Sequence, residues 1–237
     1  MKQPKQNNRF RSLYALFTVS LLSTGYLLSP YGRVDAIMVE GDTTVPEQLI
    51  IDSSGITSKQ TMLATVWNEN YIEALVKAQH PKISDVAVDR EGLNGILLSI
   101  IDFETIAYID TGNLYHSVLE NGDIMAEGQT VPLGNKPLLT KFESGPILLQ
   151  LITSLNEVSE DIQTSISEIN YTGTKENPYT ISFIMNDGNH VKANVTDFSD
   201  KLAYYPKYLQ DLNGQKGVID MEVGVFFTPF SEPGSES

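Results

Sequence analysis

The sequence predicts an α+β protein with one apolar N-terminal helix, a β-α-α-β-β unit, and a mostly antiparallel β domain with two helices. Three observations support this fold class. Residues 12–32 carry no charge, residues 34–104 mix helical and strand periodicity, and residues 105–229 contain mainly period-two segments separated by turn residues. A chain of 237 residues is long enough for two domains that each bury a core. Residues 1–11 and 230–237 are expected to be terminal tails.

The N-terminal apolar segment is predicted to be a transmembrane helix. As a helix, residues 12–32 would be about 30 Å long, which matches the hydrocarbon core of a bilayer. Four basic residues precede the segment and only Arg33 follows it before the acidic part begins. The positive-inside rule therefore places residues 1–11 in the cytoplasm and the rest of the chain outside. The alternative is a cleaved signal peptide, for which Leu28–Arg33 is a poor cleavage site.

The segment 34–104 predicts a strand, two helices and two further strands. Thr43 or Thr44 is expected to cap the first helix, with Pro46 in its first turn and Gly55 ending it. Pro81 is expected to end the second helix, because it disfavours helix in the residue before it. The expected elements are strand 36–41, helices 46–55 and 69–79, and strands 83–89 and 96–101.

The segment 105–229 predicts seven strands and two helices. Asn121-Gly122 and Asn186-Asp187-Gly188-Asn189 are expected to turn two hairpins. The final strand, 218–227, is apolar at every second position, so one of its faces should pack on the core. The expected strands are 105–110, 114–120, 123–125, 166–171, 179–185, 190–195 and 218–227, and the helices are 146–158 and 197–212, the latter interrupted near Pro206.

Composition and spacing indicate no catalytic site, metal site or cofactor. The chain has no cysteine, which excludes thiolate chemistry and disulfides. The net charge of -14, with all 30 acidic residues after Arg33, argues against a nucleic-acid binder. The three histidines are not spaced as metal ligands, and carboxylates such as Asp102 and Glu104 are better explained as solvated strand and loop residues. The chain is therefore expected not to be an enzyme and to take no small-molecule substrate.

Four motifs, in order behind the apolar segment, resemble those of a known family. Gly41-Asp42 matches a Val-x-Gly-Asn position, and a Tyr…Gly-x-Ile hairpin is matched by LYHSVLENGDIM. The terminal segment GVIDMEVGVFF matches the last strand of that family. A longer run is matched at Pro81, Ile83, Val88, Arg90, Glu104, Ala107 and Ile109. Together these motifs resemble the FtsQ/DivIB family of bacterial cell-division proteins.

The resemblance implies a non-catalytic scaffold of the division machinery with one membrane span. It implies that 34–104 is a POTRA domain and 105–229 a β domain. It further implies a single-pass type II protein of the cell membrane, concentrated at the division septum, whose partners are DivIC (FtsB)-like and FtsL-like division proteins. The last strand departs from proteobacterial members because Val223 and Phe227 stand where aromatic residues occur in those members.

The C-terminal strand is the candidate partner-binding site. If it forms the edge of its sheet, its unpaired backbone groups could accept an extended segment of a partner, with phenylalanine side chains as apolar anchors. Tyr204 and Tyr208 share a helix face that could either pack on the core or extend the partner surface. The candidate residues are Glu222, Val223, Gly224, Val225, Phe226, Phe227, Tyr204 and Tyr208.

Three rival functions each require a feature of the sequence. A POTRA-bearing assembly or secretion factor would be expected to carry repeated POTRA units or a following barrel, and the sequence predicts neither. A cell-wall-active enzyme would need a nucleophile or an acid pair, and no such set was found. A secreted binding protein would require cleavage of the apolar segment.

Overall fold

The computed structural model describes residues 8–29 and 32–230, and the chain divides into two compact units, 1–102 and 103–237. The first unit opens with helix α1 (Asn8–Leu28), four residues ahead of the predicted segment 12–32. Part of that segment, residues 30–31, lies outside the described residues. Among the helices of the described residues, none combines the length and apolarity that a membrane crossing requires.

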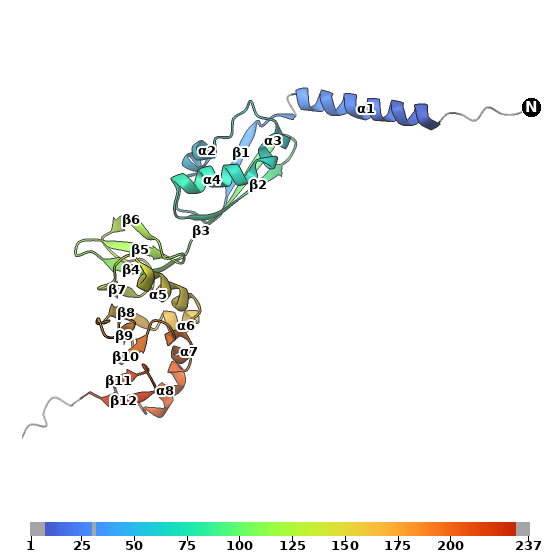
Figure 1. The fold of residues 1–237 in the computed structure, drawn as a ribbon. Helices are drawn as coiled ribbons and strands as arrows, with labels where there is room; N and C mark the ends of the chain where they lie inside the picture. Colours follow the sequence, from blue (N-terminus) through green and yellow to red (C-terminus); the bar gives the residue numbers. More distant parts are fainter. Residues whose placement is uncertain (1–7, 30–31, 231–237) are drawn as a thin grey trace, which may run out of the picture. The chain divides into compact units, whose positions relative to one another are not determined.

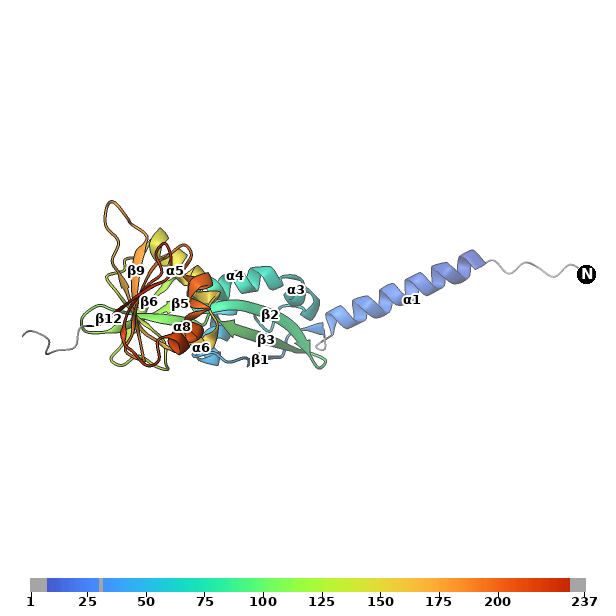
Figure 2. The same ribbon diagram turned by 90° about the horizontal axis from the view of Figure 1, so that it is seen from below.

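The rest of the first unit is a three-stranded sheet with three helices. After β1 (Ala36–Glu40) come α2 (Glu47–Ser54), α3 (Met62–Trp67), α4 (Glu69–Gln79), β2 (Ile83–Glu91) and β3 (Gly95–Asp102). The strand order is β1-β3-β2, with β1 parallel and β2 antiparallel to β3. The helices gather along this sheet (Figures 1 and 2). Ile50, Val76 and Leu98 lie at the centre of the unit's own core.

Two details of this unit differ from the sequence-based prediction. Helix α3 was not predicted, so the order is β-α-α-α-β-β rather than β-α-α-β-β. Thr43 and Thr44 do not cap α2, because Thr43 accepts a bond from Val45 N and Thr44 accepts one from Lys82. Pro46 occupies the N-cap position itself, whereas Gly55 ends the helix in the left-handed conformation as expected.

The second unit is built on a nine-stranded sheet. Its strands are β4 (Thr105–Asp110), β5 (Tyr115–Leu119), β6 (Ile124–Gln129), β7 (Leu138–Thr140), β8 (Ile166–Tyr171), β9 (Thr180–Met185), β10 (His190–Asn194), β11 (Gly217–Asp220) and β12 (Phe226–Pro229). The strand order is β12-β11-β10-β9-β8-β7-β4-β5-β6. Most pairs are antiparallel, but β7 is parallel to β4 and β8, and β11 is parallel to β10.

Four helices accompany this sheet: α5 (Pro146–Asn156), α6 (Glu160–Gln163), α7 (Phe198–Leu202) and α8 (Tyr205–Asp211). They lie along one side of it in Figure 1. The apolar face of α5 and the inward faces of β8 and β9 form one core. β7 and α6 were not predicted. The predicted helix 197–212 is two helices, and its break precedes Pro206, which lies in the first turn of α8.

The predicted final strand, 218–227, is wrong. The chain leaves β11 after Asp220 and resumes strand structure only at Phe226, so the segment is a hairpin rather than one ribbon. β12 folds back antiparallel on β11, from Gly217 opposite Pro229 to Asp220 opposite Phe226. β11 therefore lies between β10 and β12, and β12 forms one edge of the sheet while β6 forms the other.

Candidate partner-binding edge

The candidate site is the outer edge of β12. On one side β12 pairs with β11, and on the other no strand of the described residues pairs with it. A terminal strand of this kind presents backbone N–H and C=O groups to which an extended chain can bind. Among the described residues this edge is therefore unpaired, and it is shorter than the sequence predicted.

The hydrogen-bonding rungs decide which backbone groups face outward. Phe230 donates its N–H to the carbonyl of Lys216 at 3.0 Å, which continues the register of β11 and β12 by one pair. In an antiparallel pair, bonded residues alternate with residues whose groups point away. The backbone N–H and C=O groups of Phe226, Thr228 and Phe230 therefore point toward β11. The backbone groups of Phe227 and Pro229 point toward the open edge.

Pro229 stands at an outward position and has no N–H. Proline is tolerated in a sheet where its nitrogen faces away from the neighbouring strand, and this register supplies such a position. The open edge of β12 thus offers both backbone groups of Phe227 but only the carbonyl of Pro229. The N–H of Val225, one step before β12, would continue the same row if the strand were extended by a partner.

The connection between β11 and β12 is held by polar contacts to neighbouring strands and helices. Thr180 and Asn177 donate to Oε1 of Glu222 at 3.0 and 3.4 Å. Lys201 Nζ donates to the carbonyl oxygens of Met221 and Glu222 at 2.6 and 3.1 Å. The sequence suggested Glu222 as a partner-binding residue. In the structure its carboxylate instead accepts hydrogen bonds from this chain and stabilises the connection between β11 and β12.

The remaining candidates on this segment divide into exposed and packed residues. Val223, at the tip of the connection, is 95% exposed, and Phe226 on β12 is 65% exposed. Val225 is also exposed. Phe227 is half-buried and packs against the core, so its backbone rather than its ring faces the open edge. Gly224 lies in the connection beside the ring of Phe226.

The two candidate tyrosines have different environments. Tyr204 precedes α8 and is 59% exposed. Tyr208 lies one turn further along and packs against the core. Between them, Tyr205 is buried, and its hydroxyl donates to Oδ2 of Asp187 at 2.9 Å. The expected shared surface of Tyr204 and Tyr208 is therefore reduced to Tyr204.

Sequence reasoning missed the residues that end the edge. Thr228, Pro229 and Phe230 follow the predicted strand, and Phe230 packs its ring edge-on against His190 with centroids 5.2 Å apart. Phe230, an aromatic residue directly after Pro229, was the available signal for a longer element. The period-two alternation ended at Phe227, so the predicted strand ended there and left out residues 228–230.

The titratable residues considered for chemistry are dispersed. Asp102 pairs with Lys82 at 3.6 Å, and His116 Nδ1 lies 2.9 Å from the carbonyl oxygen of Met125. Within the described part of the chain, no group of three or more histidine or acidic residues is arranged to hold a metal ion.

Comparison with known proteins identifies the family. A family model described as cell division protein FtsQ/DivIB, C-terminal, matches residues 107–222. The cell division protein DivIB of Listeria monocytogenes is 34% identical over 226 residues, which cover 94% of this chain and 83% of that protein. DivIB of Bacillus subtilis is 31% identical over 233 residues, covering 98% of this chain and 87% of the relative.

Two further matches differ in coverage. DivIB of Enterococcus faecalis is 30% identical over 240 residues, and this chain spans 64% of its length. The major extracytoplasmic domain of DivIB from Geobacillus stearothermophilus aligns with a TM-score of 0.42 and 29% identity, over 48% of this chain and 96% of that one. Similarity to the Listeria and Bacillus proteins over most of both chains shows that the chain belongs to the DivIB family of cell-division proteins.

Proposed function

We propose that this chain is a non-catalytic scaffold of the bacterial division machinery that binds other division proteins by strand addition at β12. The open edge of β12 at the end of the nine-stranded sheet is the observation that carries the proposal. Strand addition draws its affinity from main-chain hydrogen bonds and its specificity from neighbouring side chains. Phe226 and Tyr204 are exposed aromatic residues that could supply such contacts.

The proposed partners are DivIC (FtsB)-like and FtsL-like division proteins acting during septum formation. Membership in the DivIB family supports a place in the division machinery. The resemblance of the terminal segment to the family's last strand supports β12 as their binding edge. The family model ends at residue 222, so β12 itself lies beyond the matched region.

We further propose that α1 anchors the chain in the cell membrane as a single span. The N-terminus would lie in the cytoplasm and both folded units outside, at the division septum. Leu13, Phe17 and Leu22 are exposed along α1, where lipid would cover them. The basic residues at the start of the chain and the acidic remainder support this orientation.

The binding edge can be tested at Val225, which is exposed and whose N–H would continue the outward row of β12 if a partner extended the strand. Val225→Pro removes the outward N–H, whereas Val225→Ala shortens the side chain and keeps the N–H. We expect the proline variant to bind a co-purified DivIC–FtsL complex at least about tenfold more weakly, which is about 1.4 kcal/mol, and the alanine variant to bind nearly as well as the wild type. Titration of the detergent-solubilised full chain gives both affinities, and equal binding by the two variants would reject strand addition at this edge.

Cysteine cross-linking gives an independent test because the chain contains no cysteine. A Phe226→Cys variant has a single thiol on the exposed face of β12. Cysteines placed at successive positions of the partner segment should form disulfides at alternate positions, because neighbouring side chains of an added strand point to opposite faces. A helical partner would instead cross-link with a spacing of three or four residues.

A further inference from the structure

A row of exposed apolar side chains runs along α3 into α4. Leu63, Trp67 and Tyr71 follow one another at intervals of four residues and are 61%, 84% and 65% exposed. Asn68 N bonds to Ala64 O at 3.1 Å and Tyr71 N bonds to Asn68 O at 3.0 Å, so the helical path is nearly continuous between the two helices. These three side chains therefore share one face.

This face points away from the core of the first unit. Met62 and Thr65 are the buried residues of α3, and Ile72 and Val76 are those of α4. The surrounding sequence also avoids charge, since Lys59 is the only charged residue between Asp52 and Glu69. An uncharged, aromatic-bearing patch of this kind on an otherwise acidic unit indicates a contact surface.

Backbone contacts hold the segment that follows α1 against the start of α3. Val34 N bonds to the carbonyl of Gln60 at 3.1 Å, and Arg33 forms a bridge with Thr61. Thr61 caps α3 by accepting from Ala64 N at 3.3 Å. Only four residues lie between Leu28 and Arg33, so the five Cα–Cα steps reach at most about 18 Å. A membrane that held α1 would therefore lie within reach of α3.

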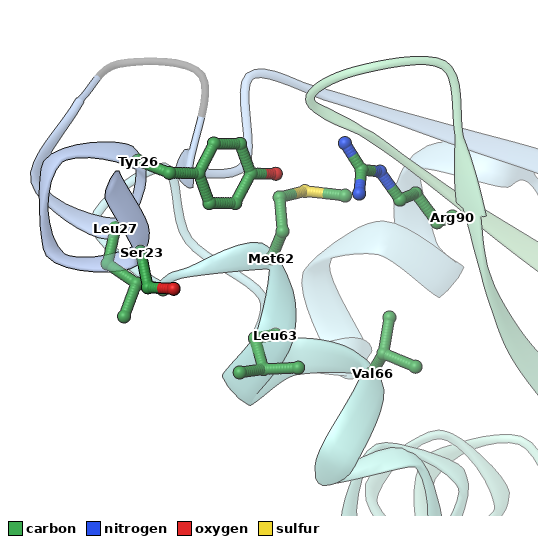
Figure 3. A pocket seen from close by; sticks show the side chains of 7 residues that line it. All are labelled: Ser23, Tyr26, Leu27, Met62, Leu63, Val66 and Arg90. Carbon is green, nitrogen blue, oxygen red and sulfur yellow. The ribbon is translucent and has the colours of Figure 1, made fainter. Parts of the chain in front are cut away.

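A cavity of about 380 Å³ lies between these elements. Ser23, Tyr26 and Leu27 of α1, together with Met62, Leu63 and Val66 of α3, form its walls, and Arg90 of β2 completes the lining (Figure 3). Leu27 also lines a second hollow with Leu63 and Trp67.

The lining is apolar apart from the guanidinium of Arg90 and two hydroxyl groups. Two carbonyls of the β2–β3 turn fix that guanidinium, since Nε donates to Gly92 O at 3.0 Å and Nη2 donates to Leu93 O at 2.7 Å. Among residues 8–29 and 32–230, no carboxylate forms an ion pair with Arg90, so its other N–H groups can bind an anion. Apolar walls next to a fixed cation match the acyl chain and phosphate of an anionic phospholipid.

We propose that the α3 face, defined as Leu63, Val66, Trp67 and Tyr71, docks the first unit onto an anionic lipid surface, with Arg90 at the headgroup phosphates. This inference rests on the proposed anchoring of α1. Tryptophan and tyrosine prefer the boundary between hydrocarbon and headgroups, which is where the short tether from α1 would hold them. Docking would fix the orientation of the first unit relative to the membrane instead of leaving it free on its tether.

Trp67 supplies the test, because it is the only tryptophan of the chain. The full chain is reconstituted at less than one copy per vesicle, in vesicles of phosphatidylcholine with or without phosphatidylglycerol. We expect lipids brominated on the acyl chains to quench Trp67 and aqueous acrylamide to quench it several-fold less than an exposed tryptophan. The matched control moves the probe to the exposed Leu49 of α2, in the variant Trp67→Phe/Leu49→Trp, which should stay open to acrylamide.

Flotation separates failure of docking from failure of anchoring. Chains that float with the vesicles while Trp67 stays open to acrylamide would overturn docking and leave the anchor intact. Chains that do not float would overturn both. Protection of Trp67 that arises only at several copies per vesicle would assign the face to a second copy of this chain and would also overturn the proposal.

The role of Arg90 is tested by Arg90→Gln, which keeps a polar side chain and removes the charge. We expect this variant to lose protection of Trp67 mainly in vesicles with phosphatidylglycerol and to match the wild type in phosphatidylcholine alone. Leu63→Gln should also expose Trp67 in vesicles with phosphatidylglycerol, because it removes an apolar contact of the α3 face. Leu63 is a surface residue, so the substitution leaves the core intact. Wild-type protection in either variant would contradict the corresponding contact.

Discussion

Among single residues, Asp187 links two elements of the second unit through side-chain hydrogen bonds. It lies in the turn between β9 and β10, where Oδ1 accepts from Asn189 N at 2.9 Å and Oδ2 accepts from the hydroxyl of Tyr205. Asn189 in turn accepts a bond from Gly217 N at 3.0 Å, at the first residue of β11. One turn thus connects α8 to the strand on which β12 folds, so it supports the binding edge from a distance.

Tyr205 should make the stability of the second unit depend on pH in the alkaline range. Burial raises the pKa of Tyr205 above its ordinary value, and the hydrogen bond to Asp187 and the charge of Asp187 raise it further. A pKa that is higher in the folded state gives stability that is complete below the unfolded value, about 10, and is lost as pH rises from there through the folded value. The free energy of unfolding should therefore fall above about pH 10.

Tyr205→Phe tests this assignment. At pH 8 the variant should lose about 1–2 kcal/mol of unfolding free energy, because the hydrogen bond from the buried Tyr205 to the carboxylate of Asp187 is lost. Above about pH 10 its decline with pH should be shallower than that of the wild type. Urea unfolding across this range measures both effects, with the exposed Tyr204→Phe as control. Parallel pH profiles for the wild type and Tyr205→Phe would contradict it.

At the level of secondary-structure elements, Gly41 allows the backbone after β1 to pass close to the backbone of β3. Its φ of 136° lies in the region that disfavours side chains, and a Cβ there would come within 2.1 Å of the carbonyl oxygen of Ile100. Both the backbone angle and the contact exclude a larger residue. The Gly41-Asp42 motif noted in the sequence thus has a structural reason in the packing of the first unit.

We expect Gly41→Ala to destabilise the first unit more than Gly92→Ala does. Gly92 also has a positive φ, 65°, but no atom would lie within 4 Å of an added Cβ. The Gly92 variant should cost about 1–2 kcal/mol from conformation alone, whereas the Gly41 variant adds a clash with backbone. Hydrogen exchange of β1 and β3 amides measures the difference, and equal costs would show that the contact with Ile100 relaxes freely.

The terminal hairpin shows how far sequence patterns predict elements. Alternation of Ile219, Met221 and Phe227 correctly identified core-facing residues, since all three are buried or packed. The same alternation continued through Val223, which is exposed at the tip of a connection. The break depends on bonds from Lys201 and Thr180, which are distant in sequence, so local periodicity could not predict it.

The sequence predicted that the C-terminal strand forms an edge of the sheet, but it did not predict which residues form that strand. An open C-terminal edge followed from the sequence, whereas its outward row depends on the pairing register of β11 and β12. Helix α3 was missed for a related reason. Its six residues are too short for a helical period to stand out, and its apolar side chains are divided between the core and the exposed face.

At the scale of the whole molecule, the described residues form two separate cores. Ile50, Val76 and Leu98 belong to the first, and Leu151 and Phe183 belong to the second. Each core is enclosed within one of the two compact units, 1–102 and 103–237. Damage to one core should therefore leave the other unit folded.

Leu98→Ala and Leu151→Ala form a matched pair of fully buried leucines for this prediction. Each should cost its own unit about 2–5 kcal/mol, because it leaves a cavity in a packed core. Hydrogen exchange followed by mass spectrometry should show faster exchange in residues 34–102 for the first variant and in 103–230 for the second. Faster exchange across both units from a single variant would show that they unfold cooperatively.

The missing donor at Pro229 has a consequence for the choice of companion. If two copies aligned their β12 edges antiparallel about Phe227, the twofold symmetry would bring each Pro229 opposite Val225 of the other copy, and two bonds would be lost. A foreign segment laid on the same edge loses one. The proline thus counts twice against homotypic association and once against heterotypic association, and it biases this edge toward an unlike chain.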